Sequence, residues 1–385
     1  MLRAIPLGMH QLWHQKLRML AATLGITFAV ILIFMQLEFR QALYASAVRY
    51  HDSWDYDLAM LSPKTDFLLV SKQFPRARLY QVLGFEEVET VTPVYLGMGI
   101  WRHPLDPSRS RSMFIIGFDP IDHGFGRLIT PENHRQLQIP YQVIFDRLSR
   151  HEYGPVADLV TRQGQVETEI NDRAFTVVDL YSVGTSFGLD GGIITSDLNF
   201  LRMFHERPKS NIDLGLVRLE PGLVPEVVRD KILGELPNDV RLLTREEFAQ
   251  LEIDHWESTT PIGYVFTFGV IMGLVVGAII VYQILYSDVQ DHMQEYATLL
   301  AMGYTHRQLR SVVLQEAVVL ATLGFLPGLI VAVGLYSISA EATQLPLAMT
   351  VEEGAIVFGL TLAMCIFSGI FALRRLRAAD PAEVF

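Results

Sequence analysis

Four long apolar stretches occur along the chain, and most polar residues lie between the first and the second of them. Each stretch has about 20 residues or more, which at about 1.5 Å per residue lets a helix cross a hydrocarbon layer of ~30 Å. We therefore expect four transmembrane helices. Their expected bounds are 19–40, 261–286, 311–338 and 354–375.

The first stretch follows Arg3, Lys16 and Arg18, as the core of a secretory signal would. It is too long for a signal, and residues 36–38, Gln-Leu-Glu, offer no small-residue cleavage site. We interpret it as a retained span. Residues 1–18 mix apolar and basic positions at helical spacing, which predicts a cytoplasmic interfacial helix on the membrane surface. A plain basic flank is the alternative.

Positive charges predict the orientation, because cytoplasmic loops are enriched in Lys and Arg. Basic residues precede the first span, occur at Arg307 and Arg310 after the second, and flank the end of the fourth at Arg374, Arg375 and Arg377. The loop 339–353 has none and carries glutamates. Both termini are therefore expected in the cytoplasm, and the segment 41–260 outside it.

Composition agrees with a membrane protein, since 50% of the residues are hydrophobic and the mean hydropathy is +0.27. From Glu38 to Thr260 there are 23 Lys and Arg against 33 Asp and Glu, so nearly all of the net charge of −11 lies there. This makes a nucleic acid or an anionic lipid surface an unlikely partner for that segment. The single cysteine, Cys365, excludes an intrachain disulfide.

The segment 41–260 alternates strand and helix patterns, which predicts an α+β domain. Its ends continue as helical stalks, with a capping box at Thr244 and Glu247 and a break at Pro261. The expected strands are 57–61, 91–101, 112–118, 142–145, 175–181, 192–195 and 213–219, and the expected helix is 224–236.

Glycines recur every four residues in two of the spans, which gives each of those helices one smooth face. Small faces let helix backbones approach closely inside a membrane, where no hydrophobic effect drives packing between helices. Packing within the chain and packing between two copies both remain open. The glycines are Gly269, Gly273, Gly277, Gly324 and Gly328.

The segment 287–310 predicts a helical elbow between the second and third spans. The second helix can continue to Gly303, a favourable residue just past a helix end, and Thr305 with Gln308 has the spacing of a capping box for the next helix. One stripe presents acidic and apolar side chains at i, i+3, i+4 and i+7, suited to binding another protein. The stripe is Glu295, Thr298, Leu299 and Met302.

Other chemistry is weakly supported. Residues 184–188, GTSFG, match a nucleophile elbow, but the following LDGG cannot start the helix that motif requires, so we expect a flexible loop rather than catalysis by Ser186. The histidines lack metal-ligand spacing, so we expect no metal and no cofactor. Glu316, just inside the third span, has either a structural role, with Arg310 as its partner, or a role in a transport cycle.

Residues 295–328, EYATLLAMGYTHRQLRSVVLQEAVVLATLGFLPG, resemble the cytoplasmic coupling segment and third span of FtsX/MacB-type (type VII) ABC transporter permeases. LWHQKLRMLAATLGITFAVILI resembles that family's first span, and LRRLRAADPAEVF its tail. YQVIFDRLSRHEYG, INDRAFTVVDLYSV and residues 217–248 resemble its periplasmic domain. Within the superfamily the chain is most similar to the DevC subfamily, the permeases of heterocyst-type glycolipid exporters.

The resemblance implies an α-helical membrane protein with four transmembrane helices and a large MacB-like α+β periplasmic domain between helices 1 and 2. It implies a multi-pass permease of the bacterial inner membrane that exports a lipid, glycolipid or other hydrophobic cargo by mechanotransmission. The implied partners are an ABC ATPase, a periplasmic membrane-fusion adaptor, an outer-membrane TolC-like channel and a second copy of the permease. The implied ATPase-coupling residues are Glu295, Thr298, Leu299, Met302, Gly303 and Arg307.

The chain itself lacks the residues for ATP hydrolysis. A Walker A loop needs Gly-Lys-Ser/Thr, and none of the five lysines follows a glycine. We therefore expect a non-catalytic subunit whose partner binds ATP. An FtsX-like signalling scaffold that regulates a periplasmic hydrolase, or a lipoprotein-releasing permease, is the alternative.

Overall fold

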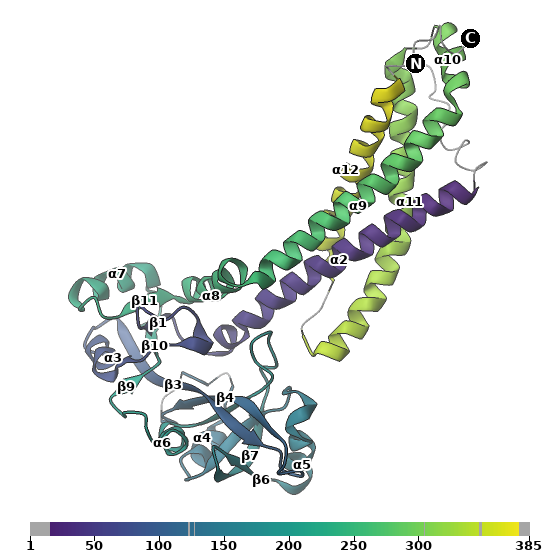
Figure 1. Cartoon of the computed structure of the whole chain (residues 1–385). Helices are drawn as coiled ribbons and strands as arrows, with labels where there is room; N and C mark the ends of the chain where they lie inside the picture. The colour runs from purple at the N-terminus through teal and green to yellow at the C-terminus, as the bar shows by residue number, and fades with distance from the viewer. Residues whose placement is uncertain (1–15, 122–123, 127, 304, 346–348, 377–385) are drawn as a thin grey trace. The chain divides into compact units, whose positions relative to one another are not determined.

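The computed structural model describes residues 16–121, 124–126, 128–303, 305–345 and 349–376 (Figure 1). The chain divides into two compact units. The helical unit contains Met1–Gln41, Ile262–Thr343 and Leu347–Phe385, and the sheet unit contains Ala42–Pro261 and Gln344–Pro346. The predicted tail 376–385 and interfacial helix 1–18 lie largely outside the described residues.

The described residues include four helices that are long and apolar enough to cross a membrane. This confirms the predicted class of membrane protein with four spanning helices. A fifth, short helix, α10 (Met293–Ala301), lies between the second and the third. The long helices are α2 (Lys16–Ser53), α9 (Pro261–Asp291), α11 (His306–Thr343) and α12 (Val351–Leu376).

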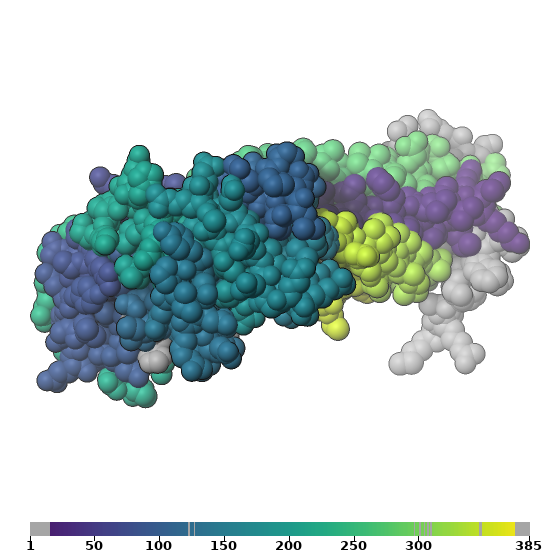
Figure 2. Space-filling view, turned by 90° about the horizontal axis from the view of Figure 1, so that it is seen from below, coloured from purple at the N-terminus to yellow at the C-terminus, as the bar shows by residue number. Residues whose placement is uncertain are grey.

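The four long helices share one apolar core in which α2 is central. Ile26, Val30 and Phe34 of α2 are fully buried in it, and the Phe34 carbonyl accepts a hydrogen bond of 2.8 Å from the Tyr336 hydroxyl of α11. Figure 2 shows α2 in purple along one face of this unit, with helices from the C-terminal half of the chain on both sides. The outer faces stay apolar, as Ile330 shows with 72% exposure, which suits lipid rather than water.

The helix of the second span covers the predicted span 261–286 but does not continue through the elbow. The pattern predicts one helix up to Gly303, whereas α9 ends at Asp291 and α10 starts at Met293. At His292 both the backbone N–H and ring Nδ1 approach the Asp288 carbonyl, at 3.1 Å and 3.0 Å. A side chain that competes for a ladder carbonyl is a known cause of a break in a helix.

Nine strands of the described part form one mixed sheet in the order β11-β1-β10-β3-β4-β8-β5-β7-β6. The edge strand β6 also meets β3 at Trp101 and Ile170, which brings the sheet toward closure. The strands are β1 (Leu58–Leu61), β3 (Val88–Arg102), β4 (Ser110–Phe118), β5 (Gln142–Asp146), β6 (Val166–Ile170), β7 (Arg173–Tyr181), β8 (Gly192–Ser196), β10 (Leu214–Leu219) and β11 (Arg241–Thr244), with a separate pair β2 (Phe74–Pro75) and β9 (Asn211–Ile212).

Helices cover both faces of this sheet, because successive strand residues point to opposite sides. Leu58 and Met60 of β1 enter one core, together with α3, α5, α6 and α7, whereas Ala59 and Leu61 enter the other, with α4, α8 and the end of α2. In Figure 1, α5 lies beside β6 and β7, and α7 and α8 lie beside β11. The helices are α3 (Arg76–Val82), α4 (Pro131–Leu137), α5 (Val156–Gln163), α6 (Asp197–Met203), α7 (Pro225–Glu235) and α8 (Arg245–Asp254).

The structure confirms seven predicted strands, as β1, β3, β4, β5, β7, β8 and β10, and the predicted helix as α7. The sequence analysis missed both edge strands, β6 and β11. The signal for β6 is present, since VETEI alternates Val166, Thr168 and Ile170, which are buried, with two glutamates, which are not. The following Asn171 and Asp172 both have positive φ, 49° and 59°, as a tight two-residue hairpin turn requires.

The predicted junction before α9 is also observed. Thr244 and Glu247 form the predicted capping box at the start of α8. A π-helical turn, His255–Thr259, follows α8, and Thr260 is extended with ψ 150° before Pro261 starts α9. The helix is therefore interrupted directly before Pro261, as predicted.

Candidate functional site

The elbow consists of α10, the turn after it and the first turns of α11. Gly303 has φ +94°, and no heavy atom lies within 4 Å of where its Cβ would be, so the requirement for glycine is conformational. The Gln308 Oε1 accepts hydrogen bonds from Thr305 N at 2.8 Å and from Thr305 Oγ1 at 3.0 Å. This is one half of the predicted capping box, and it fixes the direction in which α11 starts.

The predicted stripe on α10 divides between surface and interior. Glu295 and Thr298 are exposed, and Met302 is 64% exposed. Leu299 instead turns inward and packs with a small cluster of apolar side chains from α9, α10, α11 and α12. That cluster is Val289, Met293, Val313 and Leu373. Arg307 lies in the first turn of α11, but its side chain is outside the described part of the structure.

Two buried carboxylic acids lie near the elbow. Glu316 of α11 is 1% exposed and Asp288 of α9 is 6% exposed, and the two side chains are within hydrogen-bonding reach of each other. Among the described residues Glu316 forms no ion pair with Arg310, its expected partner. Asp288 Oδ1 also lies 3.4 Å from His292 Nδ1. Asp288 is not among the predicted site residues. It lies on α9 and Glu316 lies on α11, so the spacing of residues within one helix cannot predict that the two side chains meet.

Both glycine faces pack against α2 of the same chain. A Cβ on Gly324 would lie 2.5 Å from Ile26 Cβ, and a Cβ on Gly277 would lie 2.8 Å from Ala29 Cβ. Such distances leave no space for a side chain. The partners of Gly269, Gly273 and Gly328 are Gln36, Ile33 and Val30. The structure therefore shows contacts of these glycines within one chain, and α2 lies directly against both α9 and α11.

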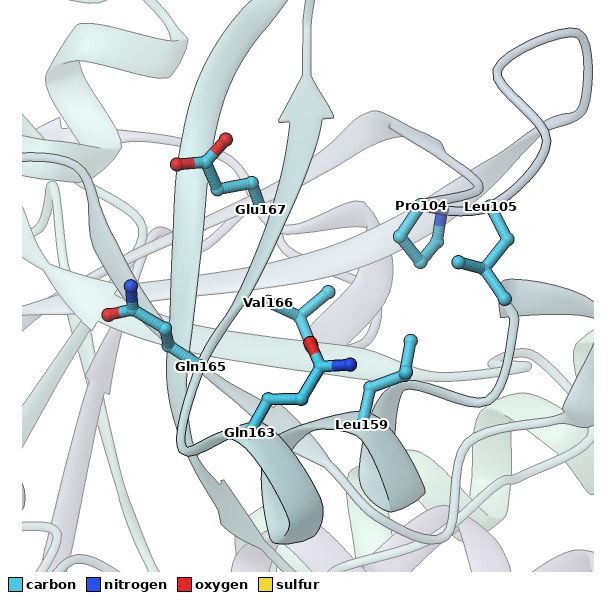
Figure 3. Close-up of a pocket in the computed structure, with 7 residues that line it drawn as sticks. All are labelled: Pro104, Leu105, Leu159, Gln163, Gln165, Val166 and Glu167. Atoms are coloured by element: carbon cyan, nitrogen blue, oxygen red, sulfur yellow. The ribbon is translucent and has the colours of Figure 1, made fainter.

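The sheet unit has a shallow pocket of about 410 Å³ between the β3–β4 loop, α5 and β6. Figure 3 shows Leu159 and Gln163 of α5 below Pro104 and Leu105 of that loop. Val166 lies between them at the start of β6. None of the predicted site residues lines this pocket, and its walls are a mixture of apolar side chains and amide groups with one carboxylate, Glu167.

A buried carboxylate accepts hydrogen bonds from the backbone of the GTSFG loop, residues 184–188 between β7 and β8. Asp146, fully buried, accepts hydrogen bonds from the backbone N–H of Gly184 at 2.7 Å and Val183 at 3.3 Å. Burial raises the pKa of Asp146 in spite of these hydrogen bonds. Ser186 Oγ accepts from Gly188 N at 3.2 Å, and no helix follows it. Within the described ranges no group of three or more His, Cys, Asp or Glu could hold a metal ion.

The elbow, Glu316 and most of the last three spans lie in one segment that matches a family model. Residues 267–381 match the family "FtsX-like permease C-terminal". This FtsX-like region begins inside α9 and includes both carboxylic acids and all five glycines. The match leaves α2 and the sheet unit outside it.

The sheet unit is similar to solved structures at low identity. One is the periplasmic region of MacB from Actinobacillus actinomycetemcomitans, with 14% identity, a TM-score of 0.38, and coverage of 53% of this chain and 94% of that one. Another is the extracellular domain of the noncanonic ABC-type transporter YknZ from Gram-positive bacteria, with 10% identity, a TM-score of 0.34, and coverage of 49% and 100%. A sequence search finds no match among curated proteins.

Proposed function

We propose that the chain is the permease subunit of an ABC exporter, driven by a separate ATPase through mechanotransmission. The observation that supports this most is the FtsX-like match over residues 267–381, because it contains the complete elbow. An exposed acidic and apolar surface between two spans suits docking of another protein. In this proposal Glu295, Thr298 and Met302 face the ATPase, and Gly303 and Arg307 belong to the turn beside them.

Stiff packing would carry force from the elbow to the sheet unit. α9 and α11 both press glycine faces on α2, so a shift of the elbow moves α2 with them. α2 is a single helix of 38 residues, about 57 Å long, which exceeds a hydrocarbon layer of ~30 Å. Its last turn supplies Tyr50 to the core of the sheet unit, and Trp54, directly after the helix, packs in the same core. We propose a positional role for Glu316 in this cycle, together with Asp288.

The remaining assignments belong to the same proposal. No lysine follows a glycine, so ATP is bound by the partner ATPase rather than by this chain. We place the protein in the bacterial inner membrane with both termini in the cytoplasm and the sheet unit in the periplasm. Its other partners are a second copy, a periplasmic adaptor and a TolC-like channel, and its cargo is a lipid, a DevC-type glycolipid or another hydrophobic compound.

ATP turnover by the reconstituted complex tests the elbow. We expect Glu295→Arg and Met302→Asp to lower turnover about tenfold or more, since misplaced charges at an interface cost several kcal/mol. Glu226→Arg, on the exposed surface of α7, is the matched control and should leave turnover unchanged. Dimer formation, measured by native mass spectrometry, should persist in all three variants. Native turnover in both elbow variants would remove the elbow from the mechanism.

A further inference from the structure

A buried histidine and a buried glutamate meet where the end of α2, α8 and the 3-10 turn Leu68–Val70 come together. His51 is 0% exposed and Glu252 is 3% exposed, and His51 Nε2 lies 3.9 Å from Glu252 Oε1. Both residues belong to the sheet unit, and both lie outside the predicted span 19–40. Ionisable groups are rarely buried so completely, because burial in an apolar core penalises the charged form.

Each side chain joins separate elements. Glu252 Oε1 accepts a hydrogen bond of 2.6 Å from the Leu68 backbone N–H, so one carboxyl group ties α8 to the 3-10 turn. His51 Nδ1 lies 3.3 Å from the Tyr56 hydroxyl, and the imidazole packs edge-on to Phe248 of α8 with ring centroids 4.3 Å apart. Among the residues that the structure describes, His51 Nε2 has no hydrogen-bond partner, and it lies 3.9 Å from Glu252 Oε1.

The surroundings favour the neutral forms of the pair. Burial raises the pKa of Glu252 to about 8 and outweighs the opposing effect of the hydrogen bond from Leu68. Arg245 of α8 acts electrostatically on His51, but its guanidinium donates to the carbonyls of Trp54 and Tyr56. The other charged groups near Tyr56 are Asp52 and Glu246, both acidic.

We propose that His51 and Glu252 form a protonation-sensitive clamp, which holds α8 on the end of α2 while Glu252 carries its proton. When that proton leaves for solvent, an anion stays in an apolar junction, where the described part of the chain gives it one hydrogen bond, from the Leu68 backbone N–H. Opening of α8 then exposes the carboxylate to water. The clamp does not depend on the ATPase partner, and it goes beyond the proposed transport function. If the sheet unit is periplasmic, the clamp responds to the pH outside the cell.

The sign of the pH effect follows from the raised pKa. A carboxyl group bound to its proton more tightly in the closed state contributes stability that is complete below its ordinary pKa of 4.5. That contribution is lost as pH rises through about 8. The junction should therefore loosen progressively across this window, and acidification should tighten it again.

Hydrogen–deuterium exchange of the full chain in lipid nanodiscs tests the clamp. From pH 5 to 9, after correction for intrinsic exchange, native α8 and the Leu68 amide should lose protection relative to Glu252→Gln, by up to about tenfold per pH unit below pH 8. Glu246→Gln, an exposed change on the same helix, should behave as native. The same pH dependence in native and Glu252→Gln protein would overturn the proposal.

A second variant guards against misfolding of the first. Glu252→Met keeps the length of the side chain, cannot titrate and suits an apolar site, although it leaves the Leu68 N–H without its acceptor. In this variant the α8 amides should exchange faster than in the native protein at low pH, and they should show no loss of protection between pH 5 and 8. A native-like pH slope in Glu252→Met would contradict the clamp as surely as one in Glu252→Gln.

Discussion

At the scale of single residues, glycines that look alike in the sequence differ in how much space surrounds the position that a Cβ atom would take. Gly324 and Gly334 both lie on α11, separated by ten positions. A Cβ at Gly324 would lie 2.5 Å from Ile26 Cβ, whereas nothing lies within 4 Å of a Cβ at Gly334. The spacing of Gly324 from Gly328 predicts a packing face, but only the structure shows that α2 is what the face contacts.

This difference predicts opposite outcomes for one substitution at two sites. Gly324→Leu should destabilise the helical unit by about 1–3 kcal/mol, because a side chain forced into a full interface displaces its neighbours. Gly334→Leu should be close to neutral, and it adds apolar surface where lipid is expected. Thermal unfolding of the two variants in the same nanodiscs checks this. Equal midpoints would show that the α2–α11 contact is loose.

At the scale of elements, the elbow shows what a sequence pattern can and cannot predict about side-chain contacts. The i, i+3, i+4, i+7 spacing predicts which α10 residues share a stripe. It cannot show that Leu299 points to Val289 and Val313, because that depends on the break at His292 and the direction in which α11 starts. Likewise, β6 has a clear alternating pattern, yet its place at the sheet edge depends on pairing with β7.

The inward direction of Leu299 predicts that two acidic substitutions on α10 differ. Leu299→Asp should detach α10 from its apolar cluster at a cost of about 1–3 kcal/mol, since it puts a charge in a half-buried site. Met302→Asp, on the exposed side, should leave α10 folded. Hydrogen–deuterium exchange of residues 293–303 measures this. If the α10 amides are equally protected from exchange in both variants, Leu299 does not anchor the helix.

At the scale of the whole molecule, the order span, large domain, three spans follows from hydropathy, because membrane spans are long and uniform. The arrangement of the sheet does not follow in this way. β4 pairs in parallel with β8, where Phe114 is opposite Gly192, and nothing local in either strand specifies a partner so distant in sequence. The His51–Glu252 contact is equally non-local, since it joins the two predicted stalks.

The central claim is that a cytoplasmic ATPase drives this chain at the elbow. Site-specific crosslinking tests it most directly, because the buried Cys365 is the only native cysteine and can be replaced by alanine. In that background, Met302→Cys in membrane vesicles containing the ATPase should crosslink to it, and Glu226→Cys in the sheet unit should not. A crosslink from position 226, or none from position 302 with the ATPase bound, would contradict the account.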